Sequence, residues 1–405
     1  MITSNRLKNL HPYVPGEQPK DRDYIKLNAN ENPYPPCPQV QQAVIDFVQN
    51  HPEKMGLYPD PDSNELHAAI ADLLNKTGGV LCRARVTTPA EVATPANEAT
   101  PAASATPLVT PAPEDVIPFT VTPDMIYSGN GSDEVLSFVF YAFFDSSAKF
   151  VMPQYTYSFY PVYAGFYNIP MDTIPLKNDW SLDTKAMLEH ARTNKGGIIF
   201  ANPNAPTGLG LKRDQVRKML EEASPDEIFI VDEAYVDFGG ESCIPLLADF
   251  KNLVIVRTFS KSLCGAGQRL GYIVSSPELV NVVTTVKNSV NHFPIDAIAQ
   301  VSGKAACLNP AYYAECARKV VNEREDFYNF LLSHGFYVLK SETNFLFAKK
   351  EGIAGDELYR KIKAEGLLIR HFNTKGIEDF VRITIGTKEQ MDLLKKAFEK
   401  VLNDC

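Results

Sequence analysis

Four polar residues that can do chemistry follow three consecutive apolar runs in the middle of the chain. Asn204 follows "GGIIFAN" (196–202), Asp232 and Tyr235 stand at the end of "EIFIVDEAY", and Lys261 follows "NLVIVRTF". Each of these residues alone carries little meaning, because polar residues end most strands and most lysines are solvated. If the runs are strands of one parallel sheet, however, their carboxyl ends meet at one edge. An acid, an amine, an amide and a phenol then lie around one spot.

Pyridoxal phosphate is the cofactor whose chemistry needs such a set. Its aldehyde forms a Schiff base with a lysine amine, and its pyridinium nitrogen needs an acidic partner to act as an electron sink. Its phosphate is bound by N–H groups at a helix N-terminus together with hydroxyl and guanidinium donors. The stretch "GNGSDE" predicts such a helix start at Ser132 and Asp133, and Ser260 and Arg269 lie on either side of Lys261. A metal site would instead need histidines or clustered carboxylates, which these strand ends do not offer.

The apolar runs have the length and composition of buried strands, and amphipathic segments such as "KRDQVRKMLEEAS" (212–224) separate them. This alternation predicts an α/β fold in which a mostly parallel sheet is covered by helices on both faces. The segment 132–145 is predicted to be a helix with Ser132 or Asp133 near its N-terminus.

The C-terminal part of the chain has a different pattern. Two amphipathic segments, 354–366 and 388–402, alternate with the strand-like "TNFLFAK" and "FVRITIG", which predicts a smaller α+β domain. We therefore expect three parts: an N-terminal arm (1–45) that packs with the small domain or a partner, a large cofactor-binding domain (46–295), and the small C-terminal domain (296–405).

Residues 84–122 interrupt this pattern with a segment rich in Pro, Ala and Thr. The hexapeptides "PAEVAT", "PANEAT" and "PAASAT" follow one another from Pro89. A proline at every sixth residue excludes a long helix, and the lack of a regular large apolar position excludes a β-helix core. We predict a flexible, solvated insertion within the large domain.

The composition of the 405-residue chain is that of an ordinary globular protein, with 44% hydrophobic and 22% charged residues. The net charge of −9 argues against a nucleic-acid groove or an anionic membrane as the main partner, but it leaves room for a local basic pocket. No stretch has the length of a transmembrane span, and the N-terminal segment lacks the apolar core of a secretory signal. The seven cysteines are scattered without a Cys-x-x-Cys pair. We predict free thiols in a reducing cytoplasm, with neither a disulfide framework nor a metal site.

Beyond these patterns, the sequence resembles the fold-type I, class I/II aminotransferases, and among them the histidinol-phosphate aminotransferases. The shared stretches cover nearly the whole chain apart from the repeat segment. In chain order they are "KLNANENPYPP", "GLYPDPDSNEL", "GNGSDEVL", "PQYTYSFY", "NPNAPTG", "VDEAYVDF", "TFSKSLCGAGQRLGY" and "FVRITIGT".

The resemblance implies pyridoxal phosphate as the cofactor and assigns roles to the residues that would hold its ring. Lys261 would be the Schiff-base residue and proton carrier, Asp232 would pair with the pyridinium nitrogen, and Tyr235 would donate to the phenolic oxygen of the ring. Tyr157 would stack on the ring face. The family has an asparagine directly before Pro-Thr-Gly where this chain has Ala205. Either Asn204 or Asn202 reaches the ring in its place, or the contact is absent.

The resemblance also implies a phosphate cup and a homodimer. The cup would consist of the backbone of Ser132 and Asp133 together with Ser260 and Arg269. Tyr58, in "YPDP", would reach the phosphate in the neighbouring subunit, so two subunits would share their active sites.

For the substrates, the resemblance implies two arginines and an asparagine. Arg382, in "VRITIG", would clamp the anionic end of each substrate, because a planar guanidinium suits a carboxylate and a phosphate equally well. Arg370, in "LLIRHF", would be a second cation for a substrate phosphate, with a solvated strand-end arginine as the alternative reading. Asn30, in "NANENP", would be a further substrate contact.

The function that the resemblance implies is a ping-pong amino transfer in histidine biosynthesis. It would interconvert L-histidinol phosphate plus 2-oxoglutarate with imidazole-acetol phosphate plus L-glutamate. A threonine-phosphate decarboxylase and an aromatic amino-acid aminotransferase of the same fold stay open as alternatives. The stretch "GAGQRLG" also suggests a nicotinamide dehydrogenase, but its glycines do not directly follow a strand and "LGYIV" after them has the pattern of another strand.

Overall fold

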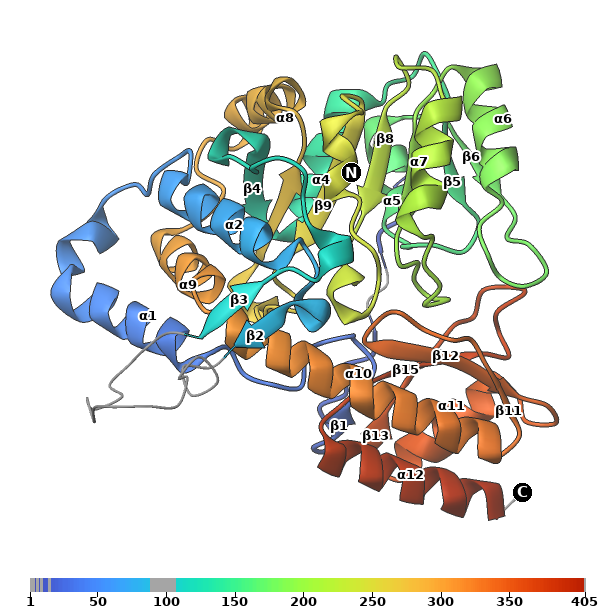
Figure 1. Ribbon diagram of the computed structural model, residues 1–405. Coiled ribbons are helices and arrows are strands. Elements are labelled where there is room, and N and C mark those ends of the chain that lie inside the picture. The colour runs from blue at the N-terminus through green and yellow to red at the C-terminus, as the bar shows by residue number, and fades with distance from the viewer. Residues whose placement is uncertain (1–3, 5–6, 8–9, 14–15, 88–106, 404–405) are drawn as a thin grey trace.

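A seven-stranded sheet forms the centre of the larger part of the computed structural model, which describes residues 4, 7, 10–13, 16–87 and 107–403 (Figure 1). The strand order is β4-β10-β9-β8-β7-β5-β6, and only β10 runs antiparallel to its neighbours. The predicted mostly parallel α/β sheet is therefore confirmed. The strands are β4 (Ile126–Asn130), β5 (Phe150–Pro153), β6 (Met171–Ile174), β7 (Ile198–Ala201), β8 (Phe229–Asp232), β9 (Leu253–Thr258) and β10 (Leu270–Val274).

The central strands are buried along their whole length, which explains their uninterrupted apolar sequences. Successive residues of β8 enter different cores: Phe229 and Val231 pack on one face of the sheet, and Ile230 packs on the other. Helices α4, α5 and α8 contribute to the core that contains Ile230, whereas α2, α6 and α7 contribute to the opposite core. The helices of this part are α1 (Pro38–Asn50), α2 (Asn64–Thr77), α4 (Gly131–Phe143), α5 (Tyr160–Tyr167), α6 (Thr184–Asn194), α7 (Arg213–Glu222), α8 (Pro277–Val290) and α9 (Ala297–Cys307).

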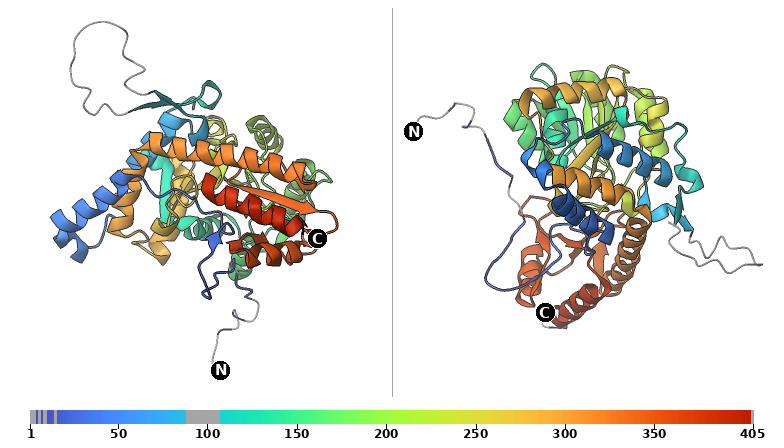
Figure 2. Two further views of the ribbon diagram at one scale, coloured as in Figure 1. Left: turned by 90° about the horizontal axis from the view of Figure 1, so that it is seen from below. Right: turned by 90° about the vertical axis from the view of Figure 1, so that its left-hand side faces the viewer.

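A four-stranded antiparallel sheet forms the smaller part, in the order β11-β12-β15-β14, with three helices packed around it (Figures 1 and 2). The predicted helices and strands of the C-terminal part are all present. The strands are β11 (Phe336–Val338), β12 (Phe345–Lys350), β14 (Arg370–His371) and β15 (Val381–Thr384), and the helices are α10 (Pro310–Ser333), α11 (Gly355–Ala364) and α12 (Lys388–Asn403).

The N-terminal arm joins the smaller part through its backbone. Strand β1 (Ile25–Lys26) pairs in parallel with β13 (Leu367–Leu368). Helix α9 lies on the C-terminal side of the boundary expected at 295/296, yet it packs against α1 and α2. The first helix that packs on the small sheet is therefore α10.

The expected insertion is structured at both of its ends, which corrects the prediction of a flexible segment over 84–122. Strand β2 (Arg85–Thr87) pairs antiparallel with β3 (Leu108–Thr110). Beyond β3, the fully buried Asp115 forms ion pairs of 2.6 Å with Arg83 and 2.9 Å with Arg213. The apolar and charged residues that flank the repeat thus pack and pair with the rest of the large domain. The repeat itself, 88–106, lies outside the described residues.

Short 3₁₀ helices connect several of the strands and helices. They are η2 (Pro52–Gly56), η3 (Leu81–Arg83), η4 (Pro113–Asp115), η5 (Pro123–Met125), η6 (Val236–Phe238), η7 (Ile244–Ala248) and η8 (Ala266–Gln268).

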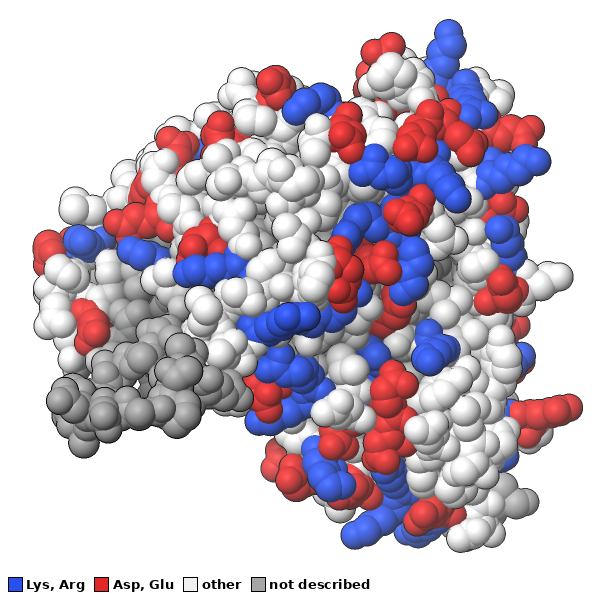
Figure 3. All heavy atoms as spheres, in the orientation of Figure 1, with Lys and Arg blue, Asp and Glu red and all other residues white. Residues whose placement is uncertain are grey.

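Acidic and basic side chains are interspersed on the face shown in Figure 3, and neither sign forms a continuous patch there. Such a mixed surface does not present the positive stripe that binds a nucleic-acid backbone. Within the described ranges, no helix is both long and apolar enough to cross a bilayer.

Candidate active site

A cavity of about 1060 Å³ lies where the carboxyl ends of the parallel strands face the small domain and the N-terminal arm. Its walls come from segments that are far apart in the sequence: the arm, the chain after β5, β7, β8 and β9, and the β14–β15 region. Six of the predicted site residues line it, namely Asn30, Tyr157, Tyr235, Lys261, Arg370 and Arg382.

Lys261 follows β9 after Phe259 and Ser260 and reaches across to the arm. Its Nζ donates a hydrogen bond of 3.4 Å to the carbonyl oxygen of Ala29 and lies 5.7 Å from the centre of the Tyr235 ring. The Tyr235 hydroxyl accepts a hydrogen bond of 2.9 Å from the Asn30 amide, whose oxygen in turn accepts one from Thr384. The amine and the phenol that the sequence predicted to act together are therefore neighbours.

Asp232 ends β8 behind the cavity wall and is only 5% exposed. One carboxylate oxygen accepts a hydrogen bond of 2.8 Å from the Tyr160 hydroxyl, and the other accepts one of 3.1 Å from the Ala234 backbone. Burial raises the pKa of Asp232 to about 6, and the bond from Tyr160 opposes this shift. A nearby cation would lower this pKa again and favour the ionised carboxylate further.

The N-terminus of α4 forms the predicted anion site together with Arg269. The helix begins at Gly131, so the N–H groups of Ser132 and Asp133 belong to its first turn, and within the described residues the Asn130 side chain does not cap them. Arg269 lies 3.3 Å from the Asp133 carboxylate. A Cβ on Gly131, which has a φ of +74°, would lie 2.4 Å from the Arg269 guanidinium. Only glycine leaves room for the arginine beside the helix start.

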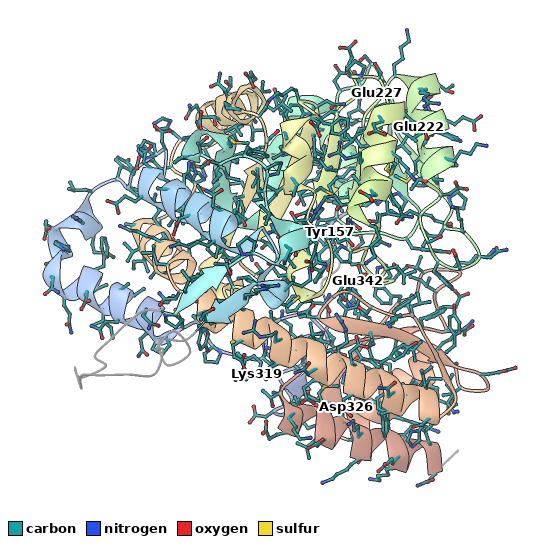
Figure 4. All side chains as sticks on the ribbon, in the orientation of Figure 1. Tyr157, Glu222, Glu227, Lys319, Asp326 and Glu342 are labelled. Atoms are coloured by element: carbon teal, nitrogen blue, oxygen red, sulfur yellow. The ribbon has the colours of Figure 1, made fainter. Side chains whose placement is uncertain are left out.

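Tyr157 contacts this anion site, and Ser260 stands between β9 and Lys261. Ser260 is buried directly before Lys261. The Tyr157 hydroxyl donates a hydrogen bond of 2.8 Å to the Asp133 carboxylate, and burial raises the pKa of this tyrosine. Figure 4 labels Tyr157 in the region where the large and small parts meet.

Arg382 lies on β15 at the small-domain side of the cavity. One of its nitrogens donates a hydrogen bond of 3.2 Å to the carbonyl oxygen of Asn28, and the guanidinium lies 5.2 Å from the Phe345 ring. Within the described residues its buried Nε has no hydrogen-bond partner. Burial lowers the pKa of the Arg382 guanidinium, and the neighbouring Arg370 adds to this effect. A desolvated cation with an unpaired donor favours an anionic ligand.

Asn204 does not line the cavity, and Ala205 does. The Asn204 amide nitrogen donates to the carbonyl oxygen of Tyr155 at 2.8 Å and to Thr207 at 3.1 Å. The Asn202 amide is held on both of its atoms by the backbone of Leu211. The geometry thus agrees with the reading in which the ring contact of the usual asparagine is absent.

Tyr58, another predicted site residue, does not line this cavity either. Its side chain is 82% exposed and stacks on Phe293, with ring centres 4.5 Å apart. It lines a separate hollow between α1, α2 and α9.

Tyr160 and Asn32 contact predicted site residues but were not themselves predicted from the sequence. Tyr160 is the hydroxyl donor to Asp232, and the Asn32 amide donates a hydrogen bond of 2.9 Å to the carbonyl oxygen of Lys261. Asn32 lies inside the "NANENP" stretch, but only Asn30 of this motif was assigned a contact from the sequence. Tyr160 gives no signal in the sequence, because it is one of several aromatic residues in "YTYSFYPVYAGFY".

The described cysteines are all free, and no three His, Cys, Asp or Glu side chains in the described part of the chain gather as metal ligands would.

Comparison with known protein families gives one match over most of the chain. The model of "Aminotransferase class I and II" matches residues 22–95 and 115–398, so the first matched range ends within the repeat and the second begins beyond it. The histidinol-phosphate aminotransferase of Syntrophus aciditrophicus is 40% identical over 401 residues, covering 99% of this chain and 98% of the relative. That of Chromohalobacter salexigens is also 40% identical, with 98% of each chain covered.

Solved structures of lower identity share the fold. The histidinol-phosphate aminotransferase of Sinorhizobium meliloti, solved in complex with pyridoxal-5'-phosphate, has a TM-score of 0.74 at 22% identity over 95% of this chain and 92% of that one. The enzyme of the same name from Clostridium acetobutylicum has a TM-score of 0.74 at 20% identity over 94% and 100%. The chain belongs to the class I and II aminotransferase family, and within it to the histidinol-phosphate aminotransferases.

Proposed function

We propose that the protein transfers the amino group between L-histidinol phosphate and 2-oxoglutarate, giving imidazole-acetol phosphate and L-glutamate in histidine biosynthesis. The near full-length relatives of 40% identity support this choice of reaction. The observation that carries it in the structure is Arg382, a buried guanidinium with an unpaired Nε in the same cavity as Lys261. Both substrates of the proposed reaction bear an anionic group that this donor could bind.

Pyridoxal phosphate is the cofactor that we propose for this cavity, because the donor set fits it. The open N-terminus of α4 with Arg269 suits the phosphate, and the glycine at position 131 leaves room for that arginine beside the helix start. Asp232 has the place and the burial of a partner for a cationic ring nitrogen. Tyr157 lines the cavity as a ring wall, and Lys261 is the amine that would bind the cofactor covalently. Bound there, the cofactor would supply an electron sink for breaking the Cα–H bond of the amino substrate.

The protein's own groups would move and hold the proton. The Lys261 amine, once free, would take the proton from Cα and return it on the other side of the transfer, acting as general base and then as general acid. Tyr235, held by Asn30, would orient the ring through its phenolic oxygen. The small domain and the arm cover the cavity and limit the access of water.

Arg382 and Arg370 would bind the substrates' anionic ends. Their strands pair directly, with Arg370 opposite Arg382 in the register of β14 and β15. Two adjacent guanidinium groups can hold the dianionic phosphate of one substrate and a carboxylate of the other. In a ping-pong exchange the two substrates occupy one cavity in turn, so the same arginines have to bind both anionic groups.

We also propose a homodimer in which Tyr58 completes the site of the partner subunit. Its exposure supports that role, as does its absence from the walls of this chain's own cavity. The cytoplasmic location remains a prediction from the sequence.

Half-reactions of the purified protein test the proposed function. The protein reconstituted with pyridoxal phosphate should lose its visible cofactor band on adding histidinol phosphate or glutamate and regain it with the matching keto acid. Lys261→Ala should keep the fold, measured by circular dichroism, and should lose turnover. Release of carbon dioxide from threonine phosphate without amino transfer would instead support the decarboxylase alternative and would overturn this proposal.

A further inference from the structure

Tyr155 joins two segments that are 220 residues apart in the sequence. It follows β5 in the large part, and its hydroxyl donates a hydrogen bond of 2.9 Å to the carbonyl oxygen of Lys375. Lys375 belongs to the loop 372–377 between β14 and β15, which lines the cavity from the small-domain side. This bond therefore crosses between the two parts of the molecule beside the substrate cavity.

Gly376 shows how closely the two segments approach. It has a φ of +91°, and a Cβ built on it would lie 2.2 Å from the Tyr155 hydroxyl oxygen. A side chain at this position would have to displace either the tyrosine or the loop. The glycine thus permits a contact that the tyrosine alone could not make.

Tyr155 is itself held in place from the large part. The Asn204 amide donates a hydrogen bond of 2.8 Å to its carbonyl oxygen. Its ring centre lies 6.0 Å from that of Trp180, which packs edge-on against Phe380 with centres 5.0 Å apart. The Glu342 backbone N–H (Glu342 is labelled in Figure 4) donates a hydrogen bond of 2.8 Å to the carbonyl oxygen of Gly208, which is a second bond between the two parts.

The loop in turn supports the arginines of the anion site. The Phe372 ring lies 5.7 Å from the guanidinium of Arg370 and 5.7 Å from that of Arg382. A displacement of the loop would therefore move the aromatic wall against which both cations pack.

We propose that Tyr155 is a positioning residue that latches loop 372–377 onto the large part and so sets the geometry of the two arginines for the substrates' anionic ends. The inference rests on the proposed function, since it assigns Arg370 and Arg382 to substrate binding. Releasing the latch weakens the binding of both substrates and leaves the groups around Lys261 in place. The latch therefore acts on KM and not on kcat.

Steady-state kinetics of Tyr155→Phe test this inference, because the variant loses the hydroxyl and keeps the ring. We expect KM to rise roughly two- to tenfold for histidinol phosphate and for 2-oxoglutarate, with kcat within about twofold of the wild type. Tyr24→Phe is the matched control, because its hydroxyl bonds Asp21 within the same segment at 3.0 Å. It should change neither constant.

Hydrogen exchange of the holoenzyme gives a readout that does not depend on turnover. Amides in 372–377 should exchange faster in Tyr155→Phe than in the wild type and in Tyr24→Phe. The wild type could show no amino transfer while the amides of 372–377 still exchange faster in Tyr155→Phe. That result would overturn the proposed reaction and would still support the latch. Unchanged exchange together with unchanged KM, or a fall in kcat at constant KM, would overturn the latch.

Gly376→Ala provides a second variant with a defined contact. Its Cβ should push the loop away from the tyrosine and raise KM. In the double variant with Tyr155→Phe the hydroxyl oxygen at 2.2 Å from the new Cβ is absent, and the ring carbon Cζ at 3.3 Å is the nearest atom of residue 155. The combined effect on KM should therefore be smaller than the product of the single effects. Multiplicative effects would show that the two residues act independently and would contradict the latch.

Discussion

The buried carboxylate of Asp232 makes the stability of the cofactor-free protein depend on pH. An aspartate ordinarily titrates near 3.8, and burial raises the pKa of this one to about 6. Between these two values the folded state binds more protons than the unfolded state. The free energy of unfolding from this group therefore falls as the pH rises from about 4 to about 6.

Comparison with Asp232→Asn isolates this effect. The wild-type protein without cofactor should lose up to about 3 kcal/mol relative to the variant across that interval, measured by denaturant unfolding at a series of pH values. Equal pH dependence of the two proteins would show that the carboxylate titrates normally. In the reconstituted enzyme the same substitution should lower kcat by about 10²- to 10³-fold, because the electrostatic partner of the ring nitrogen is lost.

Tyr160 should tune the cofactor site through the carboxylate that it contacts. Its hydroxyl bond opposes the upward shift in the pKa of Asp232. In Tyr160→Phe this pKa should rise further, so fewer molecules carry the ionised partner at neutral pH. The Kd for pyridoxal phosphate, measured by fluorescence titration, should increase roughly two- to tenfold at pH 7 and less at higher pH. A Kd that changes equally at all pH values would contradict this explanation.

At the residue scale, the sequence predicted the groups that carry charge but not all of their partners. Lys261, Tyr235 and Arg382 were found because strand ends and a family pattern mark them. Tyr160 could not be found, because its contact with Asp232 joins residues 72 positions apart and depends on how α5 packs on the sheet. The amide of Asn204 was one of the two candidates for the ring contact, whereas the fold uses it to hold the backbone of Tyr155.

At the scale of single elements, the start of α4 depends on a glycine. Gly131→Ala should place a Cβ against Arg269 and strain a backbone with φ of +74°. We expect a loss of about tenfold or more in affinity for pyridoxal phosphate. Gly267→Ala is the matched control, because a Cβ there meets nothing within 4 Å. The control should bind the cofactor as the wild type does, and an equal loss in both variants would argue against the contact.

The hairpin of β2 and β3 makes a prediction about the segment between them. Thr87 and Leu108 are register partners, so a two-residue turn can connect them. Replacing 88–107 by Asn-Gly should leave the melting temperature within a few degrees of the wild type, because the buried Asp115 and its two arginines stay in place. Kinetic constants should not change. A variant that does not fold would show that the replaced segment contributes to stability.

Elements whose structure depends on local sequence could be predicted, and features that depend on contacts with distant residues could not. The strands before Asn204, Asp232 and Lys261 and the helices at 354–366 and 388–402 followed from apolar periodicity, since each needs only local sequence. The ends of the insertion were expected to be solvated because prolines dominate the segment, yet Val109 and Asp115 are buried by contacts with distant residues. The side on which α9 packs likewise depends on tertiary contacts.

At the scale of the whole molecule, the shared site of the proposed dimer can be tested by mixing inactive subunits. Tyr58→Ala and Lys261→Ala each damage every site in their own dimers. A dimer with one subunit of each kind keeps one site in which both residues are intact. After mixing in equal amounts and exchange of subunits, about a quarter of the wild-type activity should return. Absence of recovery, with hybrid dimers verified by mass spectrometry, would place Tyr58 outside the partner's site.

The pairing of β1 with β13 also has a consequence for synthesis on the ribosome. The partners Ile25 and Leu367 are 367 − 25 = 342 residues apart, so the first strand to emerge has to wait for one of the last. At roughly 5–20 residues per second this delay lasts on the order of 20–70 seconds. During that time the arm cannot close over the cavity, even if the large sheet has already formed. The translation speed over these intervening residues therefore sets when the nascent enzyme acquires a complete active site.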